Sequence, residues 1–200
     1  VNVTPNVISF NAALSACEKG MQWEQALSLL TQMRTSGISA DQITFNALMS
    51  ACEKDGQWGQ ALQLLYKTCK ARMWPDVVGW SSAISAFEKG AKWEKGLSLI
   101  DSMHVAALTP NVVSLSAAIA ACRQGKQWER ALSFLDQMRL SAMTTNVISF
   151  TAVISMSGSG LPWGRTQSLL EEMRSTGVTP NLVCFNAAIS ACEKVGRWEQ

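Results

Sequence analysis

The chain has 200 residues, of which 48% are hydrophobic, and its 17 basic and 15 acidic side chains give a net charge of +2. Such a balance gives no overall basic or acidic character, so bulk charge does not argue for a polyanion partner, and any basic surface must be local. The apolar runs are short and are interrupted by Ser, Asn and Glu, so the sequence predicts no membrane span, and it shows no signal or transit segment.

Six tryptophans recur every thirty-five residues without insertion or deletion. They are Trp23, Trp58, Trp93, Trp128, Trp163 and Trp198. The segment FNAALSACEK at 10–19 returns as FNALMSACEK at 45–54 and as FNAAISACEK at 185–194. A fixed period of this length predicts a repeat array. We expect one array over residues 1–200, a fragment of a longer one, with a tail at 1–6, repeats at 7–41, 42–76, 77–111, 112–146 and 147–181, and a partial repeat at 182–200.

Each repeat is predicted to be a hairpin of two helices, called here helix A and helix B. In the first repeat Phe10, Leu14 and Cys17 share one helix face, which predicts helix A over 7–19. Gly20 to Gln22 interrupt that helix, and Gly37 ends helix B. The predicted buried stripe of helix B consists of Trp23, Ala26, Leu27, Leu30 and Met33. Proline precedes helix A in most repeats, at Pro5, Pro75, Pro110 and Pro180.

Helices of about 13 residues are about 20 Å long and marginal in isolation, so the hairpins must stack on one another. The sequence therefore predicts an all-α superhelical solenoid of helix-turn-helix hairpin repeats. Four cysteines occupy equivalent positions in helix A, between small apolar residues, and we expect free thiols in the core and a reducing compartment. These are Cys17, Cys52, Cys122 and Cys192. The tryptophans of helix B are expected to pack between helices rather than to stack on bases.

The fifth repeat is the poorest helix former. Gly158, Gly160, Pro162 and Gly164 crowd its hairpin, and Gln167 replaces a core Leu. Each glycine inside a helix costs up to about 1 kcal/mol relative to alanine. We therefore predict that this repeat opens first.

A polar row runs along the other side of helix A. In the first repeat Asn11, Ser15 and Lys19 are spaced i, i+4 and i+8. The row recurs as Asn46, Ser50 and Lys54, then Ser81, Ser85 and Lys89, then Ser116, Ala120 and Gln124, then Thr151, Ser155 and Ser159, and last Asn186, Ser190 and Lys194. A polar face is ordinarily solvated surface, but short polar side chains are poor helix formers and gain nothing there. We interpret this row as a binding surface on the inner wall of the solenoid.

No catalytic chemistry is indicated by the remaining residues. His104 is the single histidine, and the sequence contains no second imidazole, clustered carboxylate pair or glycine-rich phosphate loop to accompany it. The sequence therefore predicts no enzyme, no catalytic residue, no metal site and no cofactor.

The period, the FNAAISACEK-like helix A, the WEQALSLLTQM helix B and the closing Pro-Asn or Pro-Asp resemble the pentatricopeptide repeat family, in its P-type form of thirty-five residues. The resemblance covers 7–200, with 1–6 as the tail of a preceding repeat. Tetratricopeptide arrays differ, because they run at thirty-four residues with another signature. The resemblance implies a right-handed superhelix that binds single-stranded RNA at one base per repeat.

In this family the first polar residue of helix A and the last residue of the repeat read one base together, and an apolar residue near the start of helix A packs on the base. The base-reading pairs implied here are Asn11 with Asp41, Asn46 with Asp76, Ser81 with Asn111, Ser116 with Asn146, and Thr151 with Asn181. Asn186 belongs to a sixth pair whose partner lies past residue 200. The implied base-packing residues are Ile8, Ile43, Val78, Val113, Ile148 and Val183.

Hydrogen-bond chemistry gives each pair a preferred base. A carboxylate only accepts hydrogen bonds, so Asp41 and Asp76 suit U or G, whereas an asparagine amide can donate to the ring nitrogen of A or C. Small hydroxyls leave room for a purine, and asparagine in that place favours a pyrimidine. Together with the family's pairing rules, these arguments predict 5′-UUAAA-3′. Ala40 and Thr145 replace proline before Asp41 and Asn146, which makes those two turns less rigid.

Several alternatives stay open. Four lysines at the end of helix A are candidate phosphate contacts, although a lysine there also complements the helix dipole. They are Lys19, Lys54, Lys89 and Lys194. The family implies organellar RNA metabolism (processing, stabilisation, editing or translation) in a chloroplast or mitochondrion, with single-stranded RNA and RNA-processing proteins as partners, and with no membrane and no small-molecule substrate. The alternative function is a protein–protein interaction scaffold, which the low net charge favours.

Overall fold

The computed structural model describes residues 5–70 and 75–195, apart from the side chains of Ser159, Ala191, Lys194 and Val195. Trp74 and Trp198 lie outside the described residues. Within these ranges the chain is helical and contains no strand, which confirms the predicted all-α class. Contacts divide it into two compact units, Val1–Pro110 and Asn111–Gln200. Each unit is described by itself.

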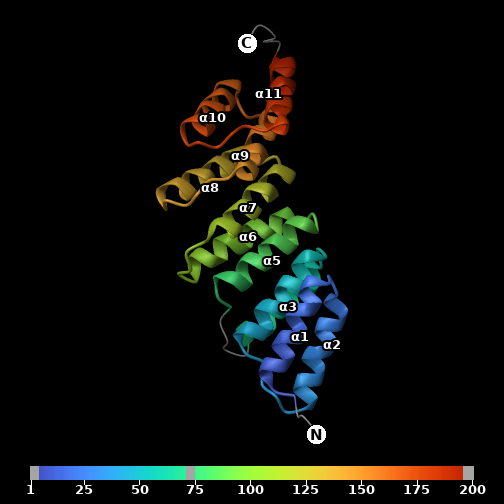
Figure 1. The fold of residues 1–200 in the computed structure, drawn as a ribbon. Helices are drawn as coiled ribbons and strands as arrows, with labels where there is room; N and C mark the ends of the chain where they lie inside the picture. Colours follow the sequence, from blue (N-terminus) through green and yellow to red (C-terminus); the bar gives the residue numbers. More distant parts are fainter. Residues whose placement is uncertain (1–4, 71–74, 196–200) are drawn as a thin grey trace. The chain divides into compact units, whose positions relative to one another are not determined.

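The first unit contains three helical hairpins. They are α1 (Val7–Lys19) with α2 (Trp23–Thr35), α3 (Gln42–Lys54) with α4 (Trp58–Lys70), and α5 (Val77–Lys89) with α6 (Trp93–Val105). The A helix α3 lies between α1 and α5 and contacts both (Figure 1). Helices α2 and α4 each contact their own A helix and the next one along the chain. The A helices of this unit therefore form one layer, as the stacking of hairpins requires.

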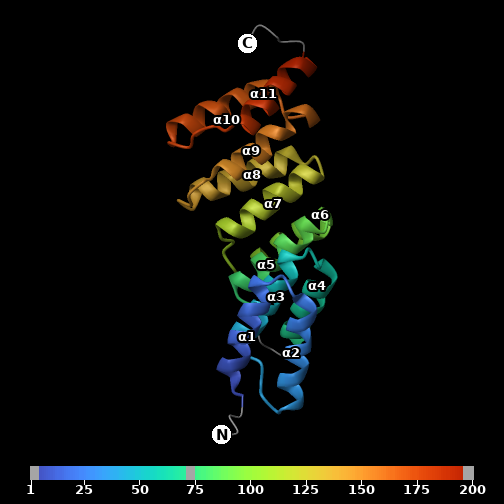
Figure 2. The ribbon, with the colours of Figure 1, turned by 45° about the vertical axis from the view of Figure 1, so that its right-hand side comes forward.

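The second unit continues the same spacing in the sequence. It contains α7 (Val112–Gln124), α8 (Trp128–Leu140), α9 (Val147–Ile154), the 3-10 helix η1 (Ser155–Ser159), α10 (Trp163–Ser175) and α11 (Leu182–Val195). Helix α9 contacts both α7 and α11, and the B helices α8 and α10 both contact α9 (Figure 2).

Each helix A begins at an Asn or Asp that closes the preceding segment. The side chain of Asp41 accepts a hydrogen bond from the Thr44 N–H at 2.8 Å, and that of Asp76 accepts one from the Gly79 N–H at 3.0 Å. Equivalent bonds are made by Asn6, Asn111, Asn146 and Asn181. Such N-caps satisfy an N–H that has no partner within the helix and contribute about 1 kcal/mol each.

Left-handed residues end most of the helices. Gly37 has φ 69° after α2, where the Ile38 N–H donates to Met33 C=O at 2.9 Å and the Gly37 N–H donates to Arg34 C=O at 3.2 Å. This is a Schellman motif, and it confirms the predicted stop. After α1, however, the left-handed residue is Met21, with φ 54°, whereas Gly20 has φ −82°. The break falls where predicted, but the glycine is not the residue that needs the unusual backbone.

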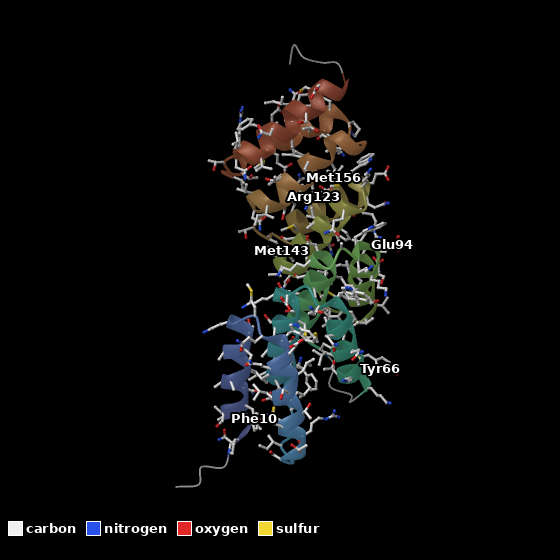
Figure 3. All side chains as sticks on the ribbon, turned by 90° about the vertical axis from the view of Figure 1, so that its right-hand side faces the viewer. Phe10, Tyr66, Glu94, Arg123, Met143 and Met156 are labelled. Carbon is white, nitrogen blue, oxygen red and sulfur yellow. The ribbon has the colours of Figure 1, made fainter. Side chains whose placement is uncertain are left out.

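The core follows the predicted stripes, with two exceptions in α2. Ala26, Leu30 and Met33 are buried in α2, and side chains fill the space between α1 and α2, where Phe10 is buried (Figure 3). Leu27 and Trp23 are only half-buried. The described tryptophans of the periodic series stand at the first residue of each helix B and are half-buried.

The cysteines behave as small apolar residues. Cys17, Cys52 and Cys122 are buried free thiols, and Cys192 is half-buried. Burial raises the pKa of the Cys52 thiol to about 11 and that of the Cys122 thiol to about 12, so both stay protonated at neutral pH. The predicted free thiols are confirmed at these positions.

The fifth repeat differs from the others, as its glycines predicted. Helix α9 ends at Ile154 and continues as η1, whereas α1, α3, α5 and α7 each span 13 residues. Gly160 then adopts φ 121°, and a Cβ at this position would lie 3.2 Å from Trp128 Nε1. Across the described residues, none of the helices is long and apolar enough to span a bilayer.

Candidate nucleic-acid interface

The first predicted base-reading pair is brought together by the stacking of α1 on α3. Asn11 lies on α1, and Asp41 is the N-cap of α3. The Asn11 Nδ2 group donates to Asp41 Oδ1 at 3.2 Å and lies 3.3 Å from Oδ2. Two side chains thirty positions apart in the sequence thus present one amide and one carboxylate side by side.

The second pair repeats this arrangement one repeat later. Asn46 Nδ2 donates to Asp76 Oδ2 at 3.0 Å, while Asp76 Oδ1 caps α5 through the Gly79 N–H. Asn46 Oδ1 accepts a hydrogen bond from Gln42 Nε2 at 3.3 Å. The amide is therefore held from both ends.

The third pair consists of Ser81 and Asn111, and it takes one residue from each compact unit. The Ser81 hydroxyl donates to the Val77 carbonyl at 2.6 Å within α5. Asn111 caps α7 through the Ser114 N–H at 2.9 Å. Their pairing stays a prediction.

The fourth and fifth predicted pairs are linked through an intermediate residue. Ser116 Oγ lies 3.1 Å from Ser149 Oγ, which in turn donates to Asn146 Oδ1 at 3.1 Å. Thr151 Oγ1 lies 2.9 Å from Cys184 Sγ, and the Cys184 N–H donates to Asn181 Oδ1 at 3.0 Å. In these pairs the third residue of the following helix A stands between the two base-reading residues. Asn186, the remaining predicted member, is exposed on α11.

All six predicted base-packing residues are exposed apolar side chains at the second position of helix A. The exposed fractions of Ile8, Ile43, Val78, Val113, Ile148 and Val183 lie between 52% and 75%. Exposure of a branched apolar side chain to water is unfavourable for the stability of the fold. The recurrence of such a side chain next to each pair marks a surface on which a flat apolar ligand face could pack.

The carboxylate of Asp41 is held in its charged form. Partial burial alone would raise its pKa, but hydrogen bonds from the Thr44 N–H, the Thr44 hydroxyl and the Asn11 amide together lower the pKa of Asp41 below its ordinary value of 3.8. At neutral pH this group can therefore only accept hydrogen bonds.

N-capping determines what the last residue of each repeat presents. The cap uses Oδ1, so the second polar atom, the acceptor Oδ2 of an aspartate or the donor Nδ2 of an asparagine, is not required by the cap. This capping role was not among the predictions from the sequence, although an Asp or Asn directly before an apolar periodic segment is a usual sign of a helix start. The restriction of these positions to Asp and Asn thus has a structural cause in addition to any role in recognition.

The candidate phosphate contacts lie at the ends of the A helices. Lys54 Nζ lies 3.3 Å from Glu18 Oε1, and Lys89 Nζ lies 3.1 Å from Glu53 Oε1, so both lysines pair with the preceding repeat. Lys19 is exposed at the end of α1, and the side chain of Lys194 lies outside the described residues. Among the described side chains, no three His, Cys, Asp or Glu residues gather into a group that could hold a metal.

Three family models match the sequence and together cover most of it. The PPR repeat family matches 5–54, the PPR repeat matches 43–73 and 78–106, and the pentatricopeptide repeat domain matches 98–159 and 165–194. The sequence has no match among the curated proteins.

Solved structures share the fold at low sequence identity. The pentatricopeptide repeat protein PPR10 of maize, in complex with an 18-nt psaJ RNA element, is 19% identical with a TM-score of 0.74 over 98% of this chain and 29% of its own. The PPR domain of Arabidopsis thaliana protein-only RNase P 1, in complex with tRNA, is 14% identical with a TM-score of 0.75 over 94% of this chain and 95% of its own. Arabidopsis thaliana nuclear proteinaceous RNase P 2 is 11% identical, with a TM-score of 0.77 over 92% of this chain and 41% of its own. The chain thus spans about three tenths of PPR10.

Proposed function

Because this chain belongs to the pentatricopeptide repeat family, we propose that it binds single-stranded RNA by sequence, with one base for each repeat. PPR10 and the PPR domain of protein-only RNase P 1 hold RNA in their solved complexes. The proposal for this chain depends on its own side chains.

One observation supports the proposal above the others. The pairs Asn11–Asp41 and Asn46–Asp76 are joined by hydrogen bonds between successive repeats, at 3.2 Å and 3.0 Å, and each lies beside an exposed branched apolar residue. A base offers a polar edge and an apolar face, and it stacks or packs on that face while the edge is hydrogen-bonded. One pair and one apolar side chain supply both kinds of contact for one base.

The proposed core target is 5′-UUAAA-3′. Two aspartates present acceptors in the first two repeats, which suits the N–H of uracil, and three asparagines present donors in the next three, which suits the bare ring nitrogen of adenine. Asn11 and Asn46 fill the space that a purine would need, whereas Ser81, Ser116 and Thr151 leave it open. In this proposal residues 1–200 act as one continuous right-handed array.

Binding RNA by sequence would let the chain occupy a transcript or deliver it to another factor. We place this role in organellar RNA processing, stabilisation, editing or translation, in a chloroplast or mitochondrion, with RNA-processing proteins as further partners. The chain itself contributes recognition and no catalytic group. No membrane contact and no small-molecule substrate enter this proposal.

The direct test measures binding of the chain to fluorescently labelled single-stranded RNA that contains UUAAA. A scrambled RNA of the same base composition is the control. We expect the UUAAA strand to bind at least about tenfold more tightly, because two or more lost base contacts cost about 1 kcal/mol each.

A protein-binding scaffold is the alternative, and two observations favour it. The net charge is only +2, and Lys54 and Lys89 are paired with glutamates of the preceding repeat. Equal affinity for the UUAAA strand and its scrambled control would favour the scaffold and count against base recognition.

A further inference from the structure

A third side chain takes part in the first base-reading pair. Thr44, the third residue of α3, is fully buried, and its hydroxyl oxygen lies 2.7 Å from Asn11 Oδ1 and 2.7 Å from Asp41 Oδ1. Its single hydroxyl hydrogen can be donated to only one of these two oxygens at a time. The same oxygen accepts the Asp41 N–H at 3.2 Å. Thr44 thus touches both members of the pair and cannot itself touch a ligand, because it has no exposed surface.

We propose that the third residue of each helix A is a positioning residue for the base-reading pair formed with the preceding repeat, and that Thr44 holds Asn11 and Asp41 in the arrangement that selects uracil. This inference rests on the proposed RNA binding and names a residue that assists it without contacting the base.

Thr44 determines the direction of the Asn11 amide. With Oδ1 accepting from the Thr44 hydroxyl, the amide must turn Nδ2 toward Asp41, where it donates at 3.2 Å. Nδ2 carries a second hydrogen that can donate to a uracil carbonyl, while the carboxylate accepts the uracil N–H. Without the hydroxyl, Asn11 loses one of its two anchors and gains rotational freedom that binding must then remove.

Other repeats provide a comparison within the same molecule. The third residue of α5 is Gly79, which has no hydroxyl, and a Cβ built there would lie 3.2 Å from Asn46 Oδ1. The second pair is anchored instead by Gln42, at the longer distance of 3.3 Å. In the second unit Ser149 and Cys184 occupy the equivalent place and contact Ser116 and Thr151. Thr44, Ser149 and Cys184 thus each contact the base-reading residue of the preceding helix A. These are the cases in which the third residue of helix A has a polar side chain and lies in the same compact unit as that base-reading residue.

The test compares Thr44→Val, which removes the hydroxyl and keeps the branched shape, with Thr44→Ser, which keeps the hydroxyl. Ser9→Ala is the matched control, because Ser9 is also the third residue of a helix A, but its hydroxyl bonds to its own cap Asn6 and to neither Asn11 nor Asp41. Each variant is titrated with RNA containing UUAAA, CUAAA or UCAAA.

We expect Thr44→Val to reduce the preference for U over C at the first nucleotide by about fivefold, the equivalent of about 1 kcal/mol for one hydrogen bond. The preference at the second nucleotide should stay unchanged, and Thr44→Ser and Ser9→Ala should resemble the original chain. An NMR titration of the free protein should also show a higher pKa for Asp41 in Thr44→Val, since the Thr44 hydroxyl stabilises its charged form.

Two results would overturn the inference. One is an unchanged preference at the first nucleotide in Thr44→Val, and the other is an equal loss at both nucleotides, which would indicate general destabilisation. If the original chain itself shows no preference among the three RNAs, the proposed function fails as well. The binding measurements on the original chain therefore test the proposed function separately, before any variant is measured.

Discussion

The Asp and Asn residues that close the repeats perform two tasks with the two polar atoms of one side chain. In Asp76 one oxygen caps α5 through the Gly79 N–H, and the other accepts a hydrogen bond from Asn46. The cap contributes to stability, and in the proposed function the second atom contributes to recognition. A change at the helix A member of the pair should therefore alter base preference without disturbing the cap.

Asn46→Ser tests this separation. Serine leaves room for a purine while Asp76 still accepts a hydrogen bond from the base, so we expect the preference at the second nucleotide to change from U to G. The first nucleotide, read by Asn11 and Asp41, is the internal control and should remain U. Affinities for UUAAA, UGAAA and GUAAA strands decide the matter, and an unaltered preference for UUAAA would contradict the assignment of Asn46.

Ile43→Ala tests the apolar contact. Ile43 is 64% exposed, so its truncation should change the free energy of unfolding by less than about 0.5 kcal/mol. Burial of the lost carbons against a base is worth about 1–2 kcal/mol, and we expect RNA affinity to fall about fivefold to thirtyfold with base preference unchanged.

The matched control for Ile43→Ala is Val105→Ala. Val105 is 89% exposed and is the last residue of the B helix α6, which contains none of the predicted base-reading residues. If both substitutions weakened RNA binding equally, the row of exposed residues on the A helices would have no special role.

At the scale of the helix, the residue that follows each hairpin in a left-handed conformation affects stability. Glycine adopts this backbone without strain, whereas alanine does not. Gly37 has φ 69° after α2, and the equivalent residue after α6 is Ala107, with φ 55°. Both are exposed, and a Cβ at Gly37 would meet no atom within 4 Å. The two positions therefore differ in backbone strain and hardly in packing.

We expect Ala107→Gly to raise the free energy of unfolding by about 0.5–1 kcal/mol and Gly37→Ala to lower it by a similar amount. A left-handed backbone costs an alanine about 1–2 kcal/mol, and the greater entropy of an unfolded glycine offsets part of this gain. Urea unfolding monitored by circular dichroism measures both changes. Two substitutions that shift stability in the same direction would refute this account.

The fifth repeat is the element that should open first. Helix α9 gives way to η1, and the buried Ser157 bonds to Thr166 at 2.6 Å in place of an apolar contact. A 3-10 segment has poorer hydrogen-bond geometry than an α-helix. In hydrogen exchange we expect amides 155–161 to exchange faster than amides 13–19 of α1, and equal protection of both segments would contradict the prediction.

For the whole molecule, the proposed target has a direction as well as a composition. Acceptors come first along the chain, at Asp41 and Asp76, and asparagine donors follow, at Asn146 and Asn181. A strand read with its 5′ end toward the N-terminus must therefore begin with the uracils. We expect 5′-AAAUU-3′, which has the same bases in reverse, to bind at least about tenfold more weakly than 5′-UUAAA-3′. Equal affinities would show that the order of the repeats does not set the order of the bases.

The sequence by itself determined the helices and their spacing. A strict thirty-five-residue period, apolar residues such as Phe10, Leu14 and Cys17 on one face, and Asn or Asp before each helix A are local properties, and local properties decide where a helix starts, ends and buries its surface. The same local rules identified the weak fifth repeat. The exposed apolar residue at the second position of each helix A was implied by the family resemblance and not by these local rules.

Only the tertiary structure decided which side chains meet. Asn11 and Asp41 are thirty positions apart, and their hydrogen bond exists because α1 stacks on α3. The proposed role of Thr44 depends on the same stacking, because its contact with Asn11 crosses from one repeat to the next. From the sequence alone, this threonine could not be distinguished from one that only supports the cap of its own helix. Hydrogen bonds act over about 3 Å, so contacts between repeats follow from packing geometry, which no local pattern contains.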